Sequence, residues 1–118
     1  MFVNFSNHAS TKWSADQLRA ASVYGDIIDV PFPDVPATAN EHEIERLAEA
    51  MTQRILDLNP ACVLCQGEFC LSYAVITRLK MQGIKVVAAC SERDVVELHE
   101  ESSVKKISRF TFIQFREY

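Results

Sequence analysis

The chain has 118 residues, of which 48% are hydrophobic and 24% charged, and its formal net charge is −4 at pH 7. This length and composition predict one soluble globular domain spanning residues 1–118, with little room for a separate catalytic module. The acidic balance argues against long nucleic acid as a partner, because its phosphates require a basic surface. The sequence shows neither an apolar run that could span a bilayer nor a leader pattern, so we expect a cytoplasmic protein with no membrane partner.

The first quarter of the chain predicts a strand followed by a helix. Residues 1–5 are a short apolar run that leads into polar residues, as at the end of a buried strand. Ser14 begins a capping box, which predicts a helix from about residue 15. We expect this helix to bury Leu18, Ala21 and Ser22.

The middle of the chain predicts a second strand, a loop and the clearest helix. Residues 26–30 carry the apolar content of a strand, and the three prolines within residues 31–36 require an extended loop. Asn40 begins another capping box. The apolar residues that follow it recur every 3.6 positions up to Leu58, which predicts an amphipathic helix docked on a sheet.

Two apolar runs, residues 61–65 and 84–89, the second with Lys85 as its one charged residue, predict central parallel strands that are covered on both faces. Between them, apolar periodicity predicts a third helix from about Glu68 to Gly83. The sequence then predicts a polar turn at residues 90–93, where the fourth strand ends.

The C-terminal quarter predicts a β-hairpin. Residues 94–99 and 105–116 read as strands, separated by the polar connection 100–103. The complete order is therefore three βα units, a fourth strand and a hairpin. This order predicts an α/β fold with a Rossmann-like, mostly parallel sheet flanked by three helices, plus a C-terminal β-hairpin.

The cysteine spacing does not indicate a metal or redox site. Cys62 and Cys65 have C-x-x-C spacing but lie within a predicted strand, where positions three apart point to opposite faces. We therefore expect the four cysteines to be small buried hydrophobic residues in a reducing compartment, with Cys90, unlike Cys70, near the end of a loop. No metal and no cofactor is expected.

Polar residues follow three predicted strands, after residues 5, 65 and 89, and such strand ends meet at one edge of an open sheet. Helix N-termini at this edge favour an anionic ligand, so the pattern predicts a nucleotide-sized or phosphate-bearing molecule. The candidate ligand-binding residues are Ser6, Asn7, Thr11, Lys12, Trp13, Gln66, Gly67, Glu68, Phe69, Cys90, Ser91 and Glu92.

Several segments together resemble a known family. These are Asn4–His8 with Trp13, residues 29–33, the turn of residues 66–69, residues 84–93, and the ending at residues 112–118. They look like the small, single-domain CRISPR-associated Rossmann-fold proteins of type III systems, which resemble stand-alone CARF domains. The resemblance implies a homodimer that binds a cyclic oligoadenylate messenger, with cyclic tetra-adenylate the favoured ring. It also implies a ring nuclease that linearises the messenger and so switches off type III CRISPR signalling.

The resemblance suggests catalytic roles for three residues in a metal-independent cleavage by the ribose 2′-hydroxyl. His8 is expected to act as general acid or base, since histidine exchanges protons near neutral pH. Ser10 is expected to contact phosphate, and Arg93 to stabilise the developing negative charge. A homodimer is also expected from the apolar C-terminal strand and the proline loop.

Other interpretations remain open at this point. The protein could bind the messenger without cleaving it, as a sponge. It could be a deoxyribosyltransferase-like or TIR-like enzyme in which Glu68 is the catalytic carboxylate, or Glu68 could simply favour the positive end of its helix. Trp13 fits a base-stacking role, a hydrophobic staple or a dimer contact. A receiver-like module is disfavoured because residues 4–10 contain no acidic side chain.

Overall fold

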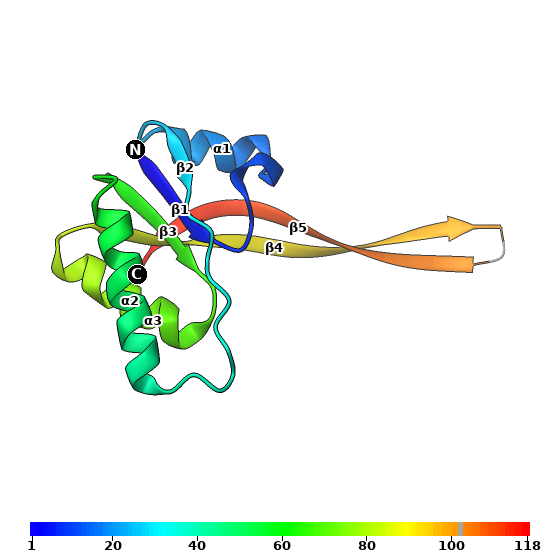
Figure 1. The fold of residues 1–118 in the computed structure, drawn as a ribbon. Helices are drawn as coiled ribbons and strands as arrows, with labels where there is room; N and C mark the ends of the chain where they lie inside the picture. The colour runs from blue at the N-terminus through cyan, green and yellow to red at the C-terminus, as the bar shows by residue number, and fades with distance from the viewer. Residues whose placement is uncertain (102) are drawn as a thin grey trace.

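The computed structural model describes residues 1–101 and 103–118, and Figure 1 shows their arrangement. The elements in chain order are β1 (Phe2–Ser6), the single-turn 3-10 helix η1 (Ser10–Lys12), α1 (Ala15–Ser22), β2 (Ile27–Asp29), α2 (Glu41–Leu56), β3 (Cys62–Gln66), α3 (Phe69–Met81), β4 (Lys85–Glu100) and β5 (Ser103–Glu117). Of the helices formed by these residues, none combines the length and the apolar character needed to cross a bilayer.

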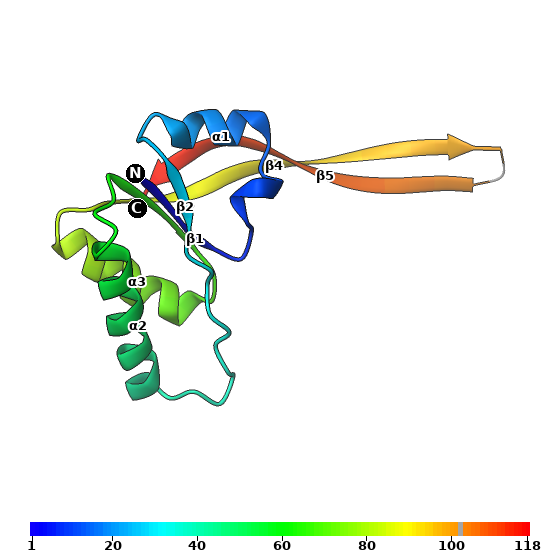
Figure 2. The ribbon, with the colours of Figure 1, turned by 45° about the horizontal axis from the view of Figure 1, so that its top comes forward.

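One five-stranded sheet has the order β2-β1-β3-β4-β5, with parallel pairing throughout except for the antiparallel pair of β4 and β5. α1 lies on one face of this sheet, and α2 and α3 lie on the other (Figures 1 and 2). The chain thus has the predicted α/β, Rossmann-like fold with three helices and a C-terminal hairpin.

Side chains cap the helices as their sequence patterns predict. The Ser14 hydroxyl accepts a hydrogen bond from the Gln17 N–H at 3.2 Å, and Asn40 Oδ1 accepts one from the Glu43 N–H at 2.9 Å. Each bond satisfies an N–H group that the first turn of a helix leaves without a partner. The capping patterns therefore located the starts of α1 and α2 correctly.

The prediction that α1 buries Leu18 and Ser22 was wrong. Only Ala21 of this helix is buried. α1 has two turns, and the aromatic residues at its two ends, Trp13 and Tyr24, cover the sheet beneath it. The helix itself therefore needs to bury only one small side chain.

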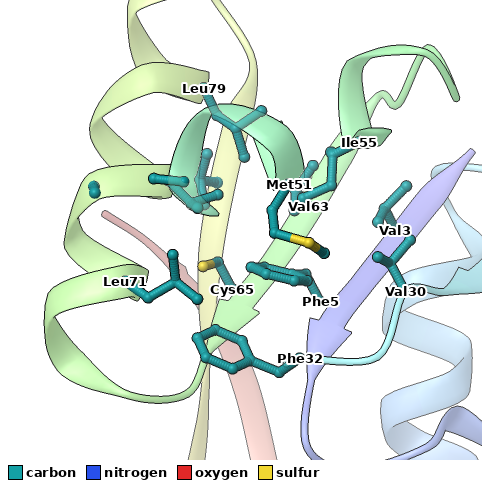
Figure 3. Packing of buried hydrophobic residues seen from close by; sticks show 14 residues of the cluster. Val3, Phe5, Val30, Phe32, Met51, Ile55, Val63, Cys65, Leu71 and Leu79 are labelled. Atoms are coloured by element: carbon teal, nitrogen blue, oxygen red, sulfur yellow. The ribbon is translucent and has the colours of Figure 1, made fainter. Parts of the chain in front are cut away.

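The larger core lies between the sheet and the helices α2 and α3 (Figure 3). The 3.6-residue periodicity of both helices supplies its helical side, as predicted. Its buried members are Val3, Phe5, Val30, Phe32, Ala48, Met51, Ile55, Val63, Cys65, Leu71, Ala74, Val75, Leu79 and Val86.

A smaller core lies on the α1 face of the sheet. Its buried members are Phe2, Ala21, Cys62, Leu64 and Val87. Cys62 therefore lies on one face of the sheet and Cys65 on the other, which confirms that the C-x-x-C pair cannot bind one ion together. Burial raises the pKa of the Cys62 thiol to about 11 and that of Cys65 to about 12, so both are protonated at neutral pH. The expected burial was wrong for Cys70, which is exposed in the first turn of α3, and Cys90 is half-buried.

The predicted turn at residues 90–93 was wrong, because β4 continues without interruption from Lys85 to Glu100. Pairing with β5 supplies its backbone hydrogen bonds, and a register shift between Cys90 and Ser91 takes the place of the turn. We call residues 91–100 and 103–112 the arm, which projects well beyond the helices in Figures 1 and 2. The predicted connection 100–103 includes Ser102, which lies outside the described residues.

Candidate functional site

The strand order places a topological switch point between β1 and β3. From β1 the chain passes to β2 on one side, and the next crossover brings β3 to the other side of β1. Connections leave in opposite directions here, so a crevice opens outside the carboxyl ends of the two strands. The polar residues after Phe5 and after Cys65 meet at this point because Phe5 pairs with Cys65.

A cleft of about 1070 Å³ lies at this switch point, on the α1 face of the sheet. The loop after β1 and the start of α1 form one wall, and the base of the arm forms another. Its lining residues are Ser6, Asn7, His8, Lys12, Trp13, Ser14, Asp16, Gln17, Leu64, Gln66, Gly67, Ala89, Ser91, Phe110, Thr111 and Phe112.

The loop after β1 is held by Asn4, a buried polar residue within an apolar strand. Its Nδ2 donates to the His8 carbonyl at 2.8 Å and to Asp29 Oδ1 at 3.0 Å. The Ser6 hydroxyl donates to Asn4 Oδ1 at 2.7 Å and accepts from the His8 N–H at 3.2 Å. These bonds fix the backbone that presents His8 to the cleft. Asp29 Oδ2 also accepts the Ser10 N–H at 3.0 Å, which ties η1 to β2.

Gln66 and Gly67 form the turn that follows β3. Gln66 Oε1 accepts the Ala89 N–H at 2.7 Å, so its side chain continues the sheet where β3 no longer pairs with β4. A Cβ atom on Gly67 would lie 2.5 Å from ring atoms of Phe32. Glycine is therefore required here by packing.

Glu68 is the N-cap of α3. Its carboxylate oxygens accept the N–H groups of Leu71 at 2.7 Å and Cys70 at 2.9 Å. These two backbone hydrogen bonds lower the pKa of Glu68. Glu68 thus stabilises the positive end of its helix, as one of the sequence interpretations proposed.

A cluster of aromatic rings borders the cleft beside α1. The ring centroid of Phe2 lies 6.1 Å from that of Trp13 and 5.1 Å from that of Phe115. Phe112 lies 4.9 Å from Phe115, and both Trp13 and Phe112 line the cleft. Trp13 therefore packs against the core through Phe2 and also lines the cleft.

The structure gathers about half of the residues predicted for the site. Those that line the cleft are Ser6, Asn7, His8, Lys12, Trp13, Gln66, Gly67 and Ser91. Those outside its lining are Ser10, Thr11, Glu68, Phe69, Cys90, Glu92 and Arg93.

The last three of these were placed at the site by the predicted turn, and the continuous β4 strand corrects that placement. Because side chains alternate along a strand, Cys90 and Glu92 project from the face opposite to Ser91. Arg93 shares the face of Ser91 but lies further out, and its guanidinium donates to the Ser108 hydroxyl at 3.0 Å.

Sequence reasoning missed Asn4 and Asp29 as organisers of the loop, and Phe110 and Phe112 as parts of the cleft wall. Asn4 carried a usable signal, because a polar residue in the apolar run Phe2–Phe5 needs a buried partner. The position of Phe110 follows only from the register of β5 on β4. In the part of the chain that the structure describes, no group of three or more His, Cys, Asp or Glu residues could hold a metal ion.

The fold and the cleft define a Rossmann-like α/β protein with a polar and aromatic cleft at the switch point of its sheet. A protein-family model described as the Uncharacterized protein MJ1673 family matches residues 1–116, so the chain belongs to this family. Comparisons with curated proteins and with solved structures gave no match.

Proposed function

We propose that the protein binds a cyclic oligoadenylate, with cyclic tetra-adenylate the favoured ring, across a homodimer and linearises it as a metal-independent ring nuclease. The observation that carries this proposal is the set of His8, Lys12, Trp13 and Gln66 in one cleft at the switch point of the sheet. In this role it lowers the concentration of the messenger in the cytoplasm and switches off type III CRISPR signalling.

The cleft combines the groups that a nucleotide ring requires. Trp13 can stack on an adenine, and the Lys12 ammonium can pair with a phosphate. The side-chain amide of Gln66 can form hydrogen bonds with polar atoms of a base or ribose. A cyclic tetra-adenylate has two-fold-compatible symmetry, which suits two identical clefts in a homodimer. Binding of this kind is local, so it is compatible with a net charge of −4.

The reaction requires a base and charge stabilisation, both of which protein side chains can supply. The ribose 2′-oxygen attacks the adjacent phosphorus, and the bond from phosphorus to the 5′-oxygen breaks. His8 accepts the proton of the 2′-hydroxyl, and the leaving 5′-oxygen takes a proton from solvent. Lys12 stabilises the charge that develops on the phosphate oxygens. The products carry a 2′,3′-cyclic phosphate and a 5′-hydroxyl. Catalytic roles for Ser10 and Arg93 stay predictions.

The alternative enzyme, a deoxyribosyltransferase-like or TIR-like glycosidase with Glu68 as the catalytic carboxylate, has less support. Both carboxylate oxygens of Glu68 accept backbone N–H groups of its own helix, and Glu68 lies outside the cleft lining. A catalytic carboxylate in that reaction has to face the substrate in a pocket.

The test is binding and cleavage of cyclic tetra-adenylate by the purified protein in EDTA. We expect the ring to raise the melting temperature, since it binds only the folded state. We also expect linear products that end in a 2′,3′-cyclic phosphate, identified by mass spectrometry. His8→Ala should slow cleavage about 100-fold while leaving the melting shift largely intact, because a general base acts on the transition state.

The matched control is His42→Ala, which removes an exposed histidine of α2 far along the chain from the cleft loop. A melting shift without turnover in the wild-type protein would favour a sponge. No shift with any ring of three to six adenylates would overturn the proposal, and cleavage abolished by EDTA would overturn its metal-independent form.

A further inference from the structure

The arm is the feature of the fold that the proposed site does not explain. It extends away from the helices in both views (Figures 1 and 2). The radius of gyration of 16.9 Å reflects this projection, since a compact chain of this length has about 13.5 Å. An isolated two-stranded hairpin is marginally stable at best in water.

The two faces of the arm differ in how much apolar surface they expose. Pairing of Ser91 with Phe112, both in the cleft wall, defines one face as the cleft side. Alternation then places Val95, Val104 and Phe110 on the cleft side, with exposures of 54%, 55% and 73%. On the opposite face, Leu98 and Ile107 are 43% and 42% exposed. The cleft side is therefore the better candidate for a protein contact.

The charges of the arm point to a second copy of this chain as the occupant. The cleft side of the arm carries Arg93 and Lys106, with Glu97 as its one carboxylate, whereas the whole chain has a net charge of −4. The other charged residues of the arm lie on the opposite face. A second copy of this acidic chain therefore complements a cleft side that carries more positive than negative charge.

The available area also fits a reciprocal dimer. Ten residue pairs run from Ser91–Phe112 to Glu100–Ser103. At about 3.4 Å per residue and about 10 Å of ribbon width, one face of the arm presents about 340 Å². If each arm covers part of the partner outside the partner's own arm, every chain buries one arm face and one patch of equal size elsewhere on its surface. About 680 Å² of each chain is then buried, which is close to the roughly 800 Å² per partner of a standard interface. The α1 layer, on the same side, exposes Val23 and Leu18 for such a patch.

We propose that two copies of the chain form a dimer in which the cleft side of each arm packs on the other copy and covers its cleft. The inference rests on the two-copy assembly of the proposed function and names its contact surface. In such a dimer, the partner's arm also brings positive charge to a cleft that has little of its own. Among the described residues, Lys12 is the only lysine or arginine in the cleft lining, with Asp16 opposing its charge. Arg93 and Lys106 lie on the cleft side of the arm.

The test is the oligomeric state of the protein without ligand, so that it stands or falls independently of messenger binding. One variant deletes residues 95–108 and joins Asp94 to Arg109 with Asn-Gly, a sequence that closes a short hairpin. We expect sedimentation equilibrium at micromolar concentration to give a dimer for the wild type and a monomer for this variant. Circular dichroism should show that the shortened protein still unfolds cooperatively.

A matched pair of substitutions tests the face of the arm. Val95→Asp and Leu98→Asp introduce the same charge on the same strand but on opposite faces. We expect Val95→Asp to weaken the dimer at least about tenfold and Leu98→Asp to leave it within about twofold. A monomeric wild type, a dimeric shortened variant, or a dimer lost only in Leu98→Asp would each overturn the proposal.

Discussion

At the scale of single residues, the candidate site depends on side chains that hold the backbone in place. Asn4 is buried, and its amide and carbonyl groups bond Ser6, His8 and Asp29. Its environment satisfies both ends of the amide, as a buried polar group requires. The sequence predicted His8 as a candidate reactive group, but the residues that position it became visible only when β1 and β2 were placed side by side.

Gly67 provides a test at this scale. A methyl group at this position would clash with the ring of Phe32, which is itself packed with its centroid 4.6 Å from that of Phe5. We expect Gly67→Ala to lower the free energy of unfolding by about 1–3 kcal/mol, the usual cost of overpacking a core. Urea denaturation measures this cost.

The double variant Gly67→Ala/Phe32→Leu tests whether the cost of Gly67→Ala comes from the clash between the alanine methyl group and the Phe32 ring. A smaller side chain at position 32 makes room for the methyl group, so the cost of Gly67→Ala should fall in the Phe32→Leu background. An equal cost in both backgrounds would show that Phe32 is not what excludes a side chain at Gly67.

At the scale of elements, the parts of the fold that sequence could predict are those that local rules determine. Capping residues and a 3.6-residue period located α2 and α3, and short apolar runs located the central strands. β4 beyond Ala89 could not be predicted in the same way. Ser91–Asp94 are polar and resemble a turn, yet they extend β4 because β5 pairs with them. The preference of exposed residues for a strand depends on such partners, which lie elsewhere in the sequence.

The start of α3 gives a pH-dependent test. Backbone hydrogen bonds lower the pKa of Glu68 in the folded protein, so the carboxylate stabilises the fold above its ordinary pKa of 4.5. That contribution is lost as the pH falls through the lowered value. Glu68→Gln keeps an oxygen acceptor but removes the charge. We therefore expect the variant to be less stable than the wild type at pH 7, by about 0.3–1 kcal/mol as for other exposed charges at a helix N-terminus, and the gap to close toward pH 3.

Urea midpoints measured from pH 3 to pH 7 give this comparison. Glu49→Gln, at an exposed position near the middle of α2, is the control and should show little difference from the wild type at any pH. A gap between Glu68→Gln and the wild type that stays constant down to pH 3 would mean that the charge of Glu68 does not contribute to the cap.

At the scale of the whole molecule, the cleft is assembled from segments about a hundred positions apart. Trp13 follows the first strand, and Phe110 and Phe112 belong to the last strand, yet all three line one cleft. Sequence could place the first two strand ends at one edge because parallel strands share that edge. It could not place β5, because the register of a hairpin and its bulge decide which of its residues face the site.

This assembly makes the only tryptophan a reporter of ligand binding. If a cyclic tetra-adenylate is held between two clefts, stacking of adenine on Trp13 should change its fluorescence, and the titration should end at one ring per two chains. In the arm-shortened variant, every residue of the single cleft is still present, but the second copy no longer closes it. We therefore expect at least about tenfold weaker binding in that variant, with adenosine monophosphate as a control ligand that cannot span two clefts. A titration that ends at one ring per chain, with equal affinity in the shortened variant, would show that each cleft binds on its own.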